Sequence, residues 1–137
     1  MKKEETAYGN ILIPLLYSKK YKRKERKERK ERINVVSEVL EIQNILEQKV
    51  KCLSGGERQR IAIARVIVND PEVIILDEPT NALNPRMKIK TLNYIEKLVQ
   101  KKILILVTHD MSIIDKSSYN CYELKNGQLT NYFSDFK

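Results

Sequence analysis

Two apolar runs that end in polar groups constrain the fold of this chain most strongly. Val73–Leu76 runs directly into Asp77 and Glu78, and Ile103–Val107 runs into Thr108, His109 and Asp110. Continuous apolar runs of this length are typical of strands buried on both faces of a parallel sheet. Between them, after Asn84-Pro85, apolar residues recur at helical spacing: Ile89, Leu92, Ile95 and Val99. The pattern predicts an α/β fold in which a helix connects two parallel strands.

The acids after the first run indicate a binding site. Open α/β sheets bind ligands at the carboxyl ends of their strands, where Asp77 and Glu78 are expected. Two adjacent buried carboxylates without a ligand would be costly. A lone histidine is usually structural, but His109 follows the second buried strand, at the same edge of the predicted sheet. We therefore expect Asp77, Glu78 and His109 to share a site.

The stretch Leu53–Arg60 predicts the start of a helix. Ser54 and Glu57 have the spacing of a capping box, in which each side chain bonds the other's amide. The helix is expected to end near Asn69-Asp70-Pro71, since proline disfavours helix at the residue before it. Gly55 and Gly56 in the first turn cost about 1 kcal/mol each against alanine. They favour either close approach to an anionic ligand at the helix N-terminus or, alternatively, an ordinary capped helix with a glycine-rich entrance.

The remaining segments give weaker patterns. Thr6–Tyr17 is apolar but contains Pro14, which predicts the end of a helical turn followed by a packed segment. Ile33–Glu47 has the apolar spacing of an amphipathic helix, and Gln48–Cys52 is expected to be a polar link. Asn126-Gly127 is a strong signal for a β-hairpin turn.

The formal net charge of +8 is concentrated in one segment. Lys19–Arg32 holds ten basic and three acidic residues, a net +7, with i, i+4 pairs such as Glu25–Arg29. A solvated helix is the first interpretation, and binding to nucleic acid or acidic lipid is the alternative. The sequence shows no secretory signal and no apolar run long enough to cross a bilayer. Cys52 and Cys121 lack metal-ligand spacing and are expected to be reduced thiols in the cytoplasm.

Four motifs together resemble one family. In order they are LSGGERQR (53–60), VIILDEPT (73–80), NALN (81–84) and VTHD (107–110). This order resembles the C-terminal two thirds of an ABC-type ATPase nucleotide-binding domain, most closely its lipoprotein-release, macrolide-export and bacteriocin-export branch. The resemblance implies an ABC helical subdomain with the signature motif over 6–68. It also implies a partial P-loop NTPase (RecA-like) α/β core over 69–137, with Walker B, D-loop and H-switch but without the P-loop strand.

The resemblance also implies residue roles. Leu53–Glu57 would be the signature motif, in which the Ser54 hydroxyl and the Gly56 amide contact the γ-phosphate of ATP held by an opposite subunit. The implied nucleotide-binding residues are Ser54, Gly55, Gly56, Glu57 and Asn84. Asp77 would orient Mg²⁺, Glu78 would be the general base, and His109 would sense the γ-phosphate. Asn81–Asn84 would be the D-loop at the dimer interface. The implied partners are ABC permease membrane subunits and a second nucleotide-binding subunit, with no nucleic acid and with membrane contact only through the permease. The implied location is the cytoplasm, at the inner face of the cell membrane.

Two departures from the family pattern affect these expectations. Asn84 stands where the D-loop usually ends in Asp. The 137 residues also contain no G-x-x-x-x-G-K-[ST]; the glycines are Gly9, Gly55, Gly56 and Gly127. Without that loop the β- and γ-phosphates lack their backbone cradle and lysine.

We therefore expect a truncated ATPase, inactive alone. The alternative is a non-catalytic subunit that lends its signature motif to an intact partner. A third alternative, a DNA-associated ATPase lobe of the SMC type, is disfavoured because no heptads precede Ser54. Transported substrate and direction cannot be read from the sequence.

Overall fold

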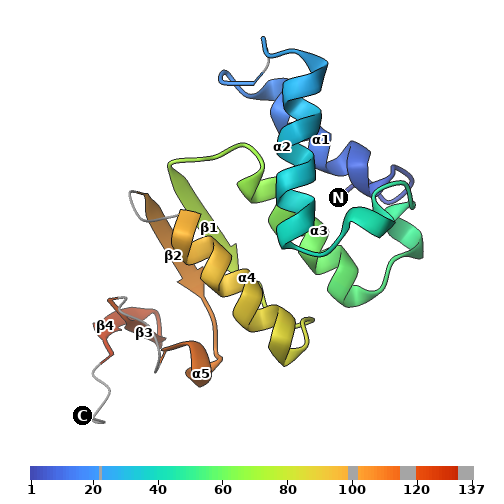
Figure 1. Cartoon of the computed structure of the whole chain (residues 1–137). Coiled ribbons are helices and arrows are strands. Elements are labelled where there is room, and N and C mark those ends of the chain that lie inside the picture. The colour runs from blue at the N-terminus through green and yellow to red at the C-terminus, as the bar shows by residue number, and fades with distance from the viewer. Residues whose placement is uncertain (22, 99–101, 115–119, 133–137) are drawn as a thin grey trace. The chain divides into compact units, whose positions relative to one another are not determined.

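A computed structural model describes residues 1–21, 23–98, 102–114 and 120–132 (Figure 1). The chain forms two compact units, Met1–Val107 and Thr108–Lys137, and each is described by itself. The division predicted at residue 69, between a helical subdomain and an α/β core, concerns parts of the first unit and stays a prediction.

Three helices form the first half of the larger unit: α1 (Ala7–Tyr17), α2 (Arg26–Val39) and α3 (Gly55–Ile67). The chain between α2 and α3 makes two 3₁₀ turns, η1 (Gln43–Ile45) and η2 (Val50–Cys52), instead of a longer helix and an extended link. α1 packs on both α2 and α3. The side chains buried between them are aliphatic, and the largest include Ile11, Leu15, Ile33, Leu40, Ile61 and Ile67. This apolar cluster is the core of the unit.

α1 corrects the prediction for Thr6–Tyr17. The helix is continuous and contains Pro14, whereas a break was expected there. Proline removes one backbone hydrogen bond inside a helix. Ile11 and Leu15 lie one turn apart and are fully buried, so the packing of this face outweighs the lost bond. Thr6 begins the helix by accepting the amide of Gly9 at 3.0 Å.

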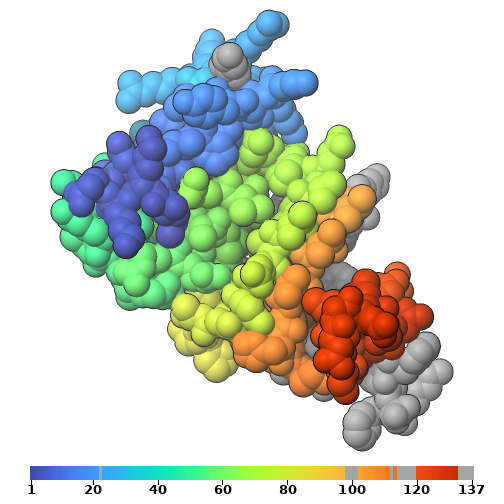
Figure 2. Space-filling view, turned by 180° about the vertical axis from the view of Figure 1, so that it is seen from behind, coloured from blue at the N-terminus to red at the C-terminus, as the bar shows by residue number. Residues whose placement is uncertain are grey.

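The observed α2 is shifted from the predicted helix Ile33–Glu47. It begins inside the basic segment because Glu25 and Glu28 form a capping box, and Glu28 accepts the amide of Glu25 at 3.0 Å. It ends early because Glu41 adopts a φ of 53°, which no helix continues. The expected Glu25–Arg29 pair is also wrong: the i, i+4 ion pair is Lys24–Glu28, at 2.8 Å. Figure 2 shows the long side chains of this region projecting at the top of the view.

The parallel strand pair is confirmed. β1 (Val73–Asp77) pairs with β2 (Ile103–Val107) in a register that runs from Val73↔Ile103 to Asp77↔Val107. The connecting helix α4 (Pro85–Leu98) begins at the predicted Asn84-Pro85; Val99, the last residue of its predicted stripe, lies outside the described residues. Within the described part of the chain this sheet has two strands.

Burial on both faces of the strands was predicted, and the structure contradicts it. Ile74 and Leu76 are 1% and 6% exposed and join the core. The opposite face is apolar and open to solvent, with exposed fractions between 47% and 63%. We call it the bare sheet face; it consists of Val73, Ile75, Ile103, Ile105 and Val107. The described helices cover one side of the sheet only, so alternate side chains remain in water.

The smaller unit holds α5 (Met111–Ile114) and an antiparallel hairpin of β3 (Tyr122–Lys125) and β4 (Gln128–Asn131). Asn126 and Gly127 have φ angles of 50° and 76°, as both central residues of a type I′ turn require. The predicted hairpin is therefore confirmed. Across the described residues of both units, no helix combines the length and hydropathy needed to span a bilayer.

Candidate functional site

The predicted capping box at the start of α3 is confirmed. The Ser54 hydroxyl oxygen accepts the Glu57 amide at 3.3 Å, and the Glu57 carboxylate accepts the Ser54 amide at 2.7 Å. The Ser54 hydroxyl also donates to that carboxylate at 2.7 Å. These two bonds from Ser54, hydroxyl first, lower the pKa of Glu57. A phosphate oxygen bound at this helix end would compete with Glu57 for the Ser54 hydroxyl.

The two glycines of the signature stretch have different surroundings. A Cβ added at Gly55 would meet no atom within 4 Å. A Cβ added at Gly56 would lie 2.7 Å from the carbonyl oxygen of Ala82, which is closer than real Cβ contacts. On its Cβ side Gly56 therefore adjoins the chain's own segment Asn81–Asn84. The predicted ligand roles of Gly55 and Gly56 stay predictions.

Gln59 makes a second link from α3 to the end of β1. Its side-chain amide donates to the carbonyl oxygen of Glu78 at 3.3 Å. The sequence reasoning did not single out Gln59. Its spacing could have indicated it. Gln59 lies three residues after Gly56 and four after Gly55, which places all three on the same face of the helix.

Glu78 occupies a strained position. Its φ is 45°, a left-handed conformation that non-glycine residues rarely adopt. Its amide donates to the Val107 carbonyl at 2.9 Å, so the end of β2 holds the residue in addition to Gln59. Strained backbone persists where surrounding structure over-determines it, and it is concentrated at functional sites. The geometry is consistent with the importance assigned to Glu78 from the sequence.

Asp77 is the last residue of β1 and is exposed. The described residues contain no group of three or more His, Cys, Asp or Glu side chains that could enclose a metal ion. Magnesium at nucleotide sites needs fewer protein ligands, because one or two carboxylates share it with water and phosphate oxygens. A single exposed carboxylate at a strand end fits that requirement, and Asp77 would supply one oxygen ligand.

Asn84 caps the N-terminus of α4, a role that the sequence indicated only through the predicted helix start at Asn84-Pro85. Its side-chain oxygen accepts the Met87 amide at 2.9 Å, so Asn84 caps α4. Aspartate, the residue usual at this position in the resembled family, would cap the helix equally well. The predicted contact of Asn84 across a dimer interface stays a prediction.

His109 belongs to the smaller unit and is exposed. Next to it, the Asp110 amide donates to the Thr108 hydroxyl at 3.1 Å. Asp77 and Glu78 lie in the larger unit and His109 lies in the smaller one, and the two units are described separately. That the three residues share a site therefore stays a prediction.

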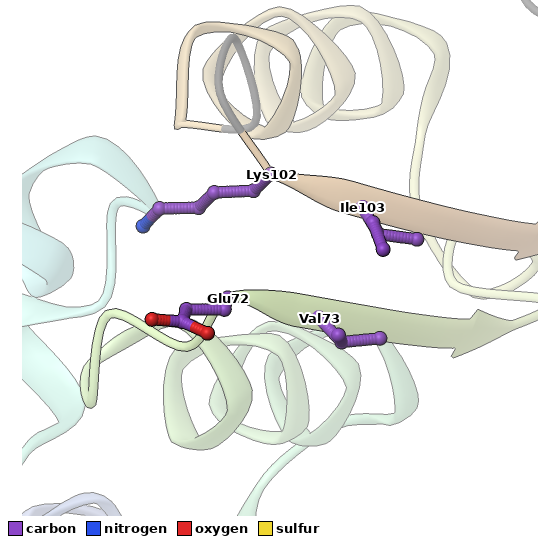
Figure 3. A pocket seen from close by; sticks show the side chains of 4 residues that line it. All are labelled: Glu72, Val73, Lys102 and Ile103. Atoms are coloured by element: carbon purple, nitrogen blue, oxygen red, sulfur yellow. The ribbon is translucent and has the colours of Figure 1, made fainter.

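A hollow of about 450 Å³ lies at the opposite end of the strands (Figure 3). Glu72, Val73, Lys102 and Ile103 line it, where β1 and β2 begin. Parallel sheets bind ligands where their strands end. This hollow is therefore distinct from the predicted site.

Residues 1–81 match the family described as "ABC transporter". The chain is 42% identical over 92 residues to the thiamine import ATP-binding protein ThiQ of Histophilus somni, covering 65% of this chain and 42% of that protein. It is 33% identical over 128 residues to the methionine import ATP-binding protein MetN 2 of Oenococcus oeni, covering 92% of this chain and 35% of the relative. A dimeric bacterial ABC transporter cassette, MJ0796, superposes with a TM-score of 0.74 at 33% identity, covering 81% of this chain and 49% of that one.

These matches establish the class and then the family. The fold is a mixed α/β fragment that matches part of the ABC cassette structures. The chain belongs to the ABC transporter family. It spans well under half the length of these two curated relatives and about half of the solved cassette. Both relatives are named as import proteins, so they give no support to the export branch that the motifs suggested.

Proposed function

We propose that this chain supplies the signature motif for an ATP held by an opposite subunit of an ABC transporter and the hydrolytic carboxylates for a second ATP site. The 137 residues contain no P-loop, so they hydrolyse no ATP by themselves. The observation that carries the proposal is the contact of Gly56 with the Ala82 carbonyl, together with the Gln59–Glu78 bond. Both tie the signature helix to the segment that follows Asp77 and Glu78.

In this proposal the residues act on two nucleotides. Ser54 and the amides at the start of α3 would face the γ-phosphate of ATP held by the opposite subunit, because a helix N-terminus favours an anion. The remaining residues would act on a nucleotide whose phosphates are held by the P-loop part of a cassette. Asp77 would hold Mg²⁺, which neutralises phosphate charge when bound. Glu78 would orient and deprotonate the attacking water, and its fixed backbone would hold the carboxylate in position. His109 would contact the γ-phosphate.

The test is complementation with the P-loop part of a complete cassette, added as a separate polypeptide. We expect no ATP hydrolysis from the chain alone and partial hydrolysis from the mixture. Glu78→Gln should abolish the recovered rate, and His109→Ala should reduce it strongly. Glu72→Gln is the matched control, because Glu72 is an exposed glutamate at the other end of the same strand. Recovered hydrolysis that survives Glu78→Gln would show that the site is misassigned.

The second candidate is a non-catalytic subunit that lends its signature motif to an intact ATPase. Its supporting observation is that Ser54 and Gly55 are exposed at a well-formed helix start, ready for a partner's nucleotide. In that arrangement, adding this chain to an intact ATP-binding subunit would raise hydrolysis at the partner's P-loop. Ser54→Ala would remove the stimulation, whereas Glu78→Gln would not.

We infer that the chain works at the inner face of the cell membrane, against ABC permease subunits and a second nucleotide-binding subunit. Support comes from the family and from the dimeric state of the similar cassette. The curated relatives favour import over export as the transport direction. Uptake assays in cells with and without the chain would test that direction.

A further inference from the structure

The end of the helical region carries an exposed group of cations beside exposed apolar side chains. We call residues 16–21 and 23–30, from the last turn of α1 through the first turns of α2, the basic tip. Leu16 and Tyr17 at the end of α1 are 41% and 83% exposed. The cations that follow include five exposed residues whose side chains make no hydrogen bond or ion pair to the described residues: Lys19, Arg23, Arg26, Lys27 and Lys30.

The two glutamates of the basic tip contact groups of the basic tip itself. Glu25 and Glu28 form the capping box of α2, and Glu28 also pairs with Lys24 at 2.8 Å. These contacts lower the pKa of Glu28, with the Lys24 bond contributing most. Glu28 is therefore held ionised beside Lys24, while Glu25 accepts a backbone amide, and the cations without an ion pair outnumber the acids on the outer surface.

The loop within the basic tip is held in place. The Arg29 guanidinium donates to the Lys24 carbonyl at 2.7 Å and to the Tyr21 carbonyl at 3.4 Å. Lys20 pairs with Asp70 at 2.6 Å, beyond the end of α3. Arg26 and Lys30 lie one turn apart on the same side of α2, with Lys27 next to Arg26, and Arg23 lies in the connection that precedes the helix. The charge is thus presented by an ordered surface.

We propose that the basic tip binds directly to the anionic lipid surface of a membrane. Unpaired Lys and Arg are attracted to anionic headgroups, and an exposed tyrosine and leucine beside them suit the boundary between headgroups and acyl chains. Duplex nucleic acid would use the cations but would leave Leu16 and Tyr17 without a partner. The proposal does not rest on the proposed function, since a chain that bound no ATP would still bind lipid.

The test is flotation of the full chain with phosphatidylcholine vesicles containing about a quarter phosphatidylserine. Each cation near such a surface contributes about fivefold in affinity, so changing Arg23, Arg26, Lys27 and Lys30 to Gln should weaken binding by roughly a hundredfold or more. The matched control removes the same charge elsewhere from exposed lysines: Lys2, Lys3, Lys49 and Lys97 to Gln. Equal losses in the two variants would mean that only net charge matters and would overturn the proposal.

A second variant separates lipid from other partners without changing charge. Leu16→Ser with Tyr17→Ser should weaken vesicle binding about tenfold, because less apolar surface is buried. Binding to a short DNA duplex should not change. Binding to pure phosphatidylcholine as tight as to the anionic vesicles would overturn the proposal, as would tighter binding to duplex DNA than to vesicles. Circular dichroism of each variant checks that α1 and α2 remain folded.

Discussion

At Gly56 the first turn of α3 approaches the backbone of the segment that follows Asp77 and Glu78. Nothing but a hydrogen atom fits between its Cα and the Ala82 carbonyl, whereas Gly55 next to it faces open space. Gly55 and Gly56 can therefore be compared as two neighbouring glycines in different surroundings. Both glycines lie in the first turn of a helix, both lack a side chain, and only one is confined by the backbone of another segment.

We expect Gly56→Ala to lower the free energy of unfolding by roughly 1–3 kcal/mol, because the added methyl group overpacks a backbone contact. Gly55→Ala should be neutral or stabilising by up to about 1 kcal/mol, through helix propensity. Urea unfolding followed by circular dichroism measures both. Equal effects of the two substitutions would show that Ala82 is not in contact with the helix in solution.

At the scale of elements, Asp70 joins three parts of the larger unit. It follows α3 with a φ of 53° and contacts Lys20 from the α1–α2 connection and Lys102 just before β2. The bonds from Lys102 and then Lys20 lower the pKa of Asp70 to about 2. Arg32 on α2 adds a further link by donating to the Ile67 and Val68 carbonyls at 3.0 and 2.9 Å. The end of α3 is therefore fixed by charged groups from both sides.

The lowered pKa of Asp70 predicts how stability depends on pH. Its carboxylate is ionised in the folded chain down to about pH 2, while in the unfolded chain it takes up a proton near its usual pKa of 3.8. The stabilisation is thus complete above the unfolded pKa and is lost as pH falls from about 4 to 2. Solvent screening limits it to about 1 kcal/mol. Asp70→Asn should lower stability at pH 7 and flatten this part of the pH profile; an unchanged profile would contradict the ion pairs.

Elements defined by local chemistry were predictable from the sequence. Ser54 with Glu57, Asn84 with Pro85, and Asn126 with Gly127 each carry their own start or turn signal, and all three features are confirmed. The ends of α2 were not predictable, because Glu25 is an uncommon cap and the left-handed Glu41 is held by tertiary ion pairs to Lys90 and Arg86. The continuity of α1 through Pro14 likewise depends on packing.

The site was partly predictable for a similar reason. The apolar run Val73–Leu76 placed Asp77 and Glu78 at the end of a strand, and β1 does end at Asp77, with Glu78 next to it. The contact of Gly56 with Ala82 joins positions far apart in the sequence, and no pattern in either segment signals it. The exposure of the bare sheet face was not predicted. An apolar run indicates a strand, but it does not indicate whether helices of the same chain cover one face of the sheet or both.

At the scale of the whole molecule, the bare sheet face predicts self-association. Large exposed apolar patches on a sheet are interaction sites or aggregation liabilities. Ile75 is 63% exposed, while its neighbour Ile74 is 1% exposed on the opposite face. We expect Ile75→Lys to reduce self-association in sedimentation velocity and to leave unfolding nearly unchanged. Ile74→Lys, the matched control, should prevent folding because it buries a charge. Self-association indifferent to Ile75→Lys would place the contact elsewhere.

The same bare sheet face has a consequence for the lifetime of the chain in a cell. Chaperones and proteases continuously remove unfolded chains, so a change of about 1–2 kcal/mol in stability changes abundance several-fold. A partner that covered Ile75, Ile105 and Val107 would protect the chain from this removal. The steady-state level of the protein would then follow the supply of that partner more closely than the rate of its own synthesis.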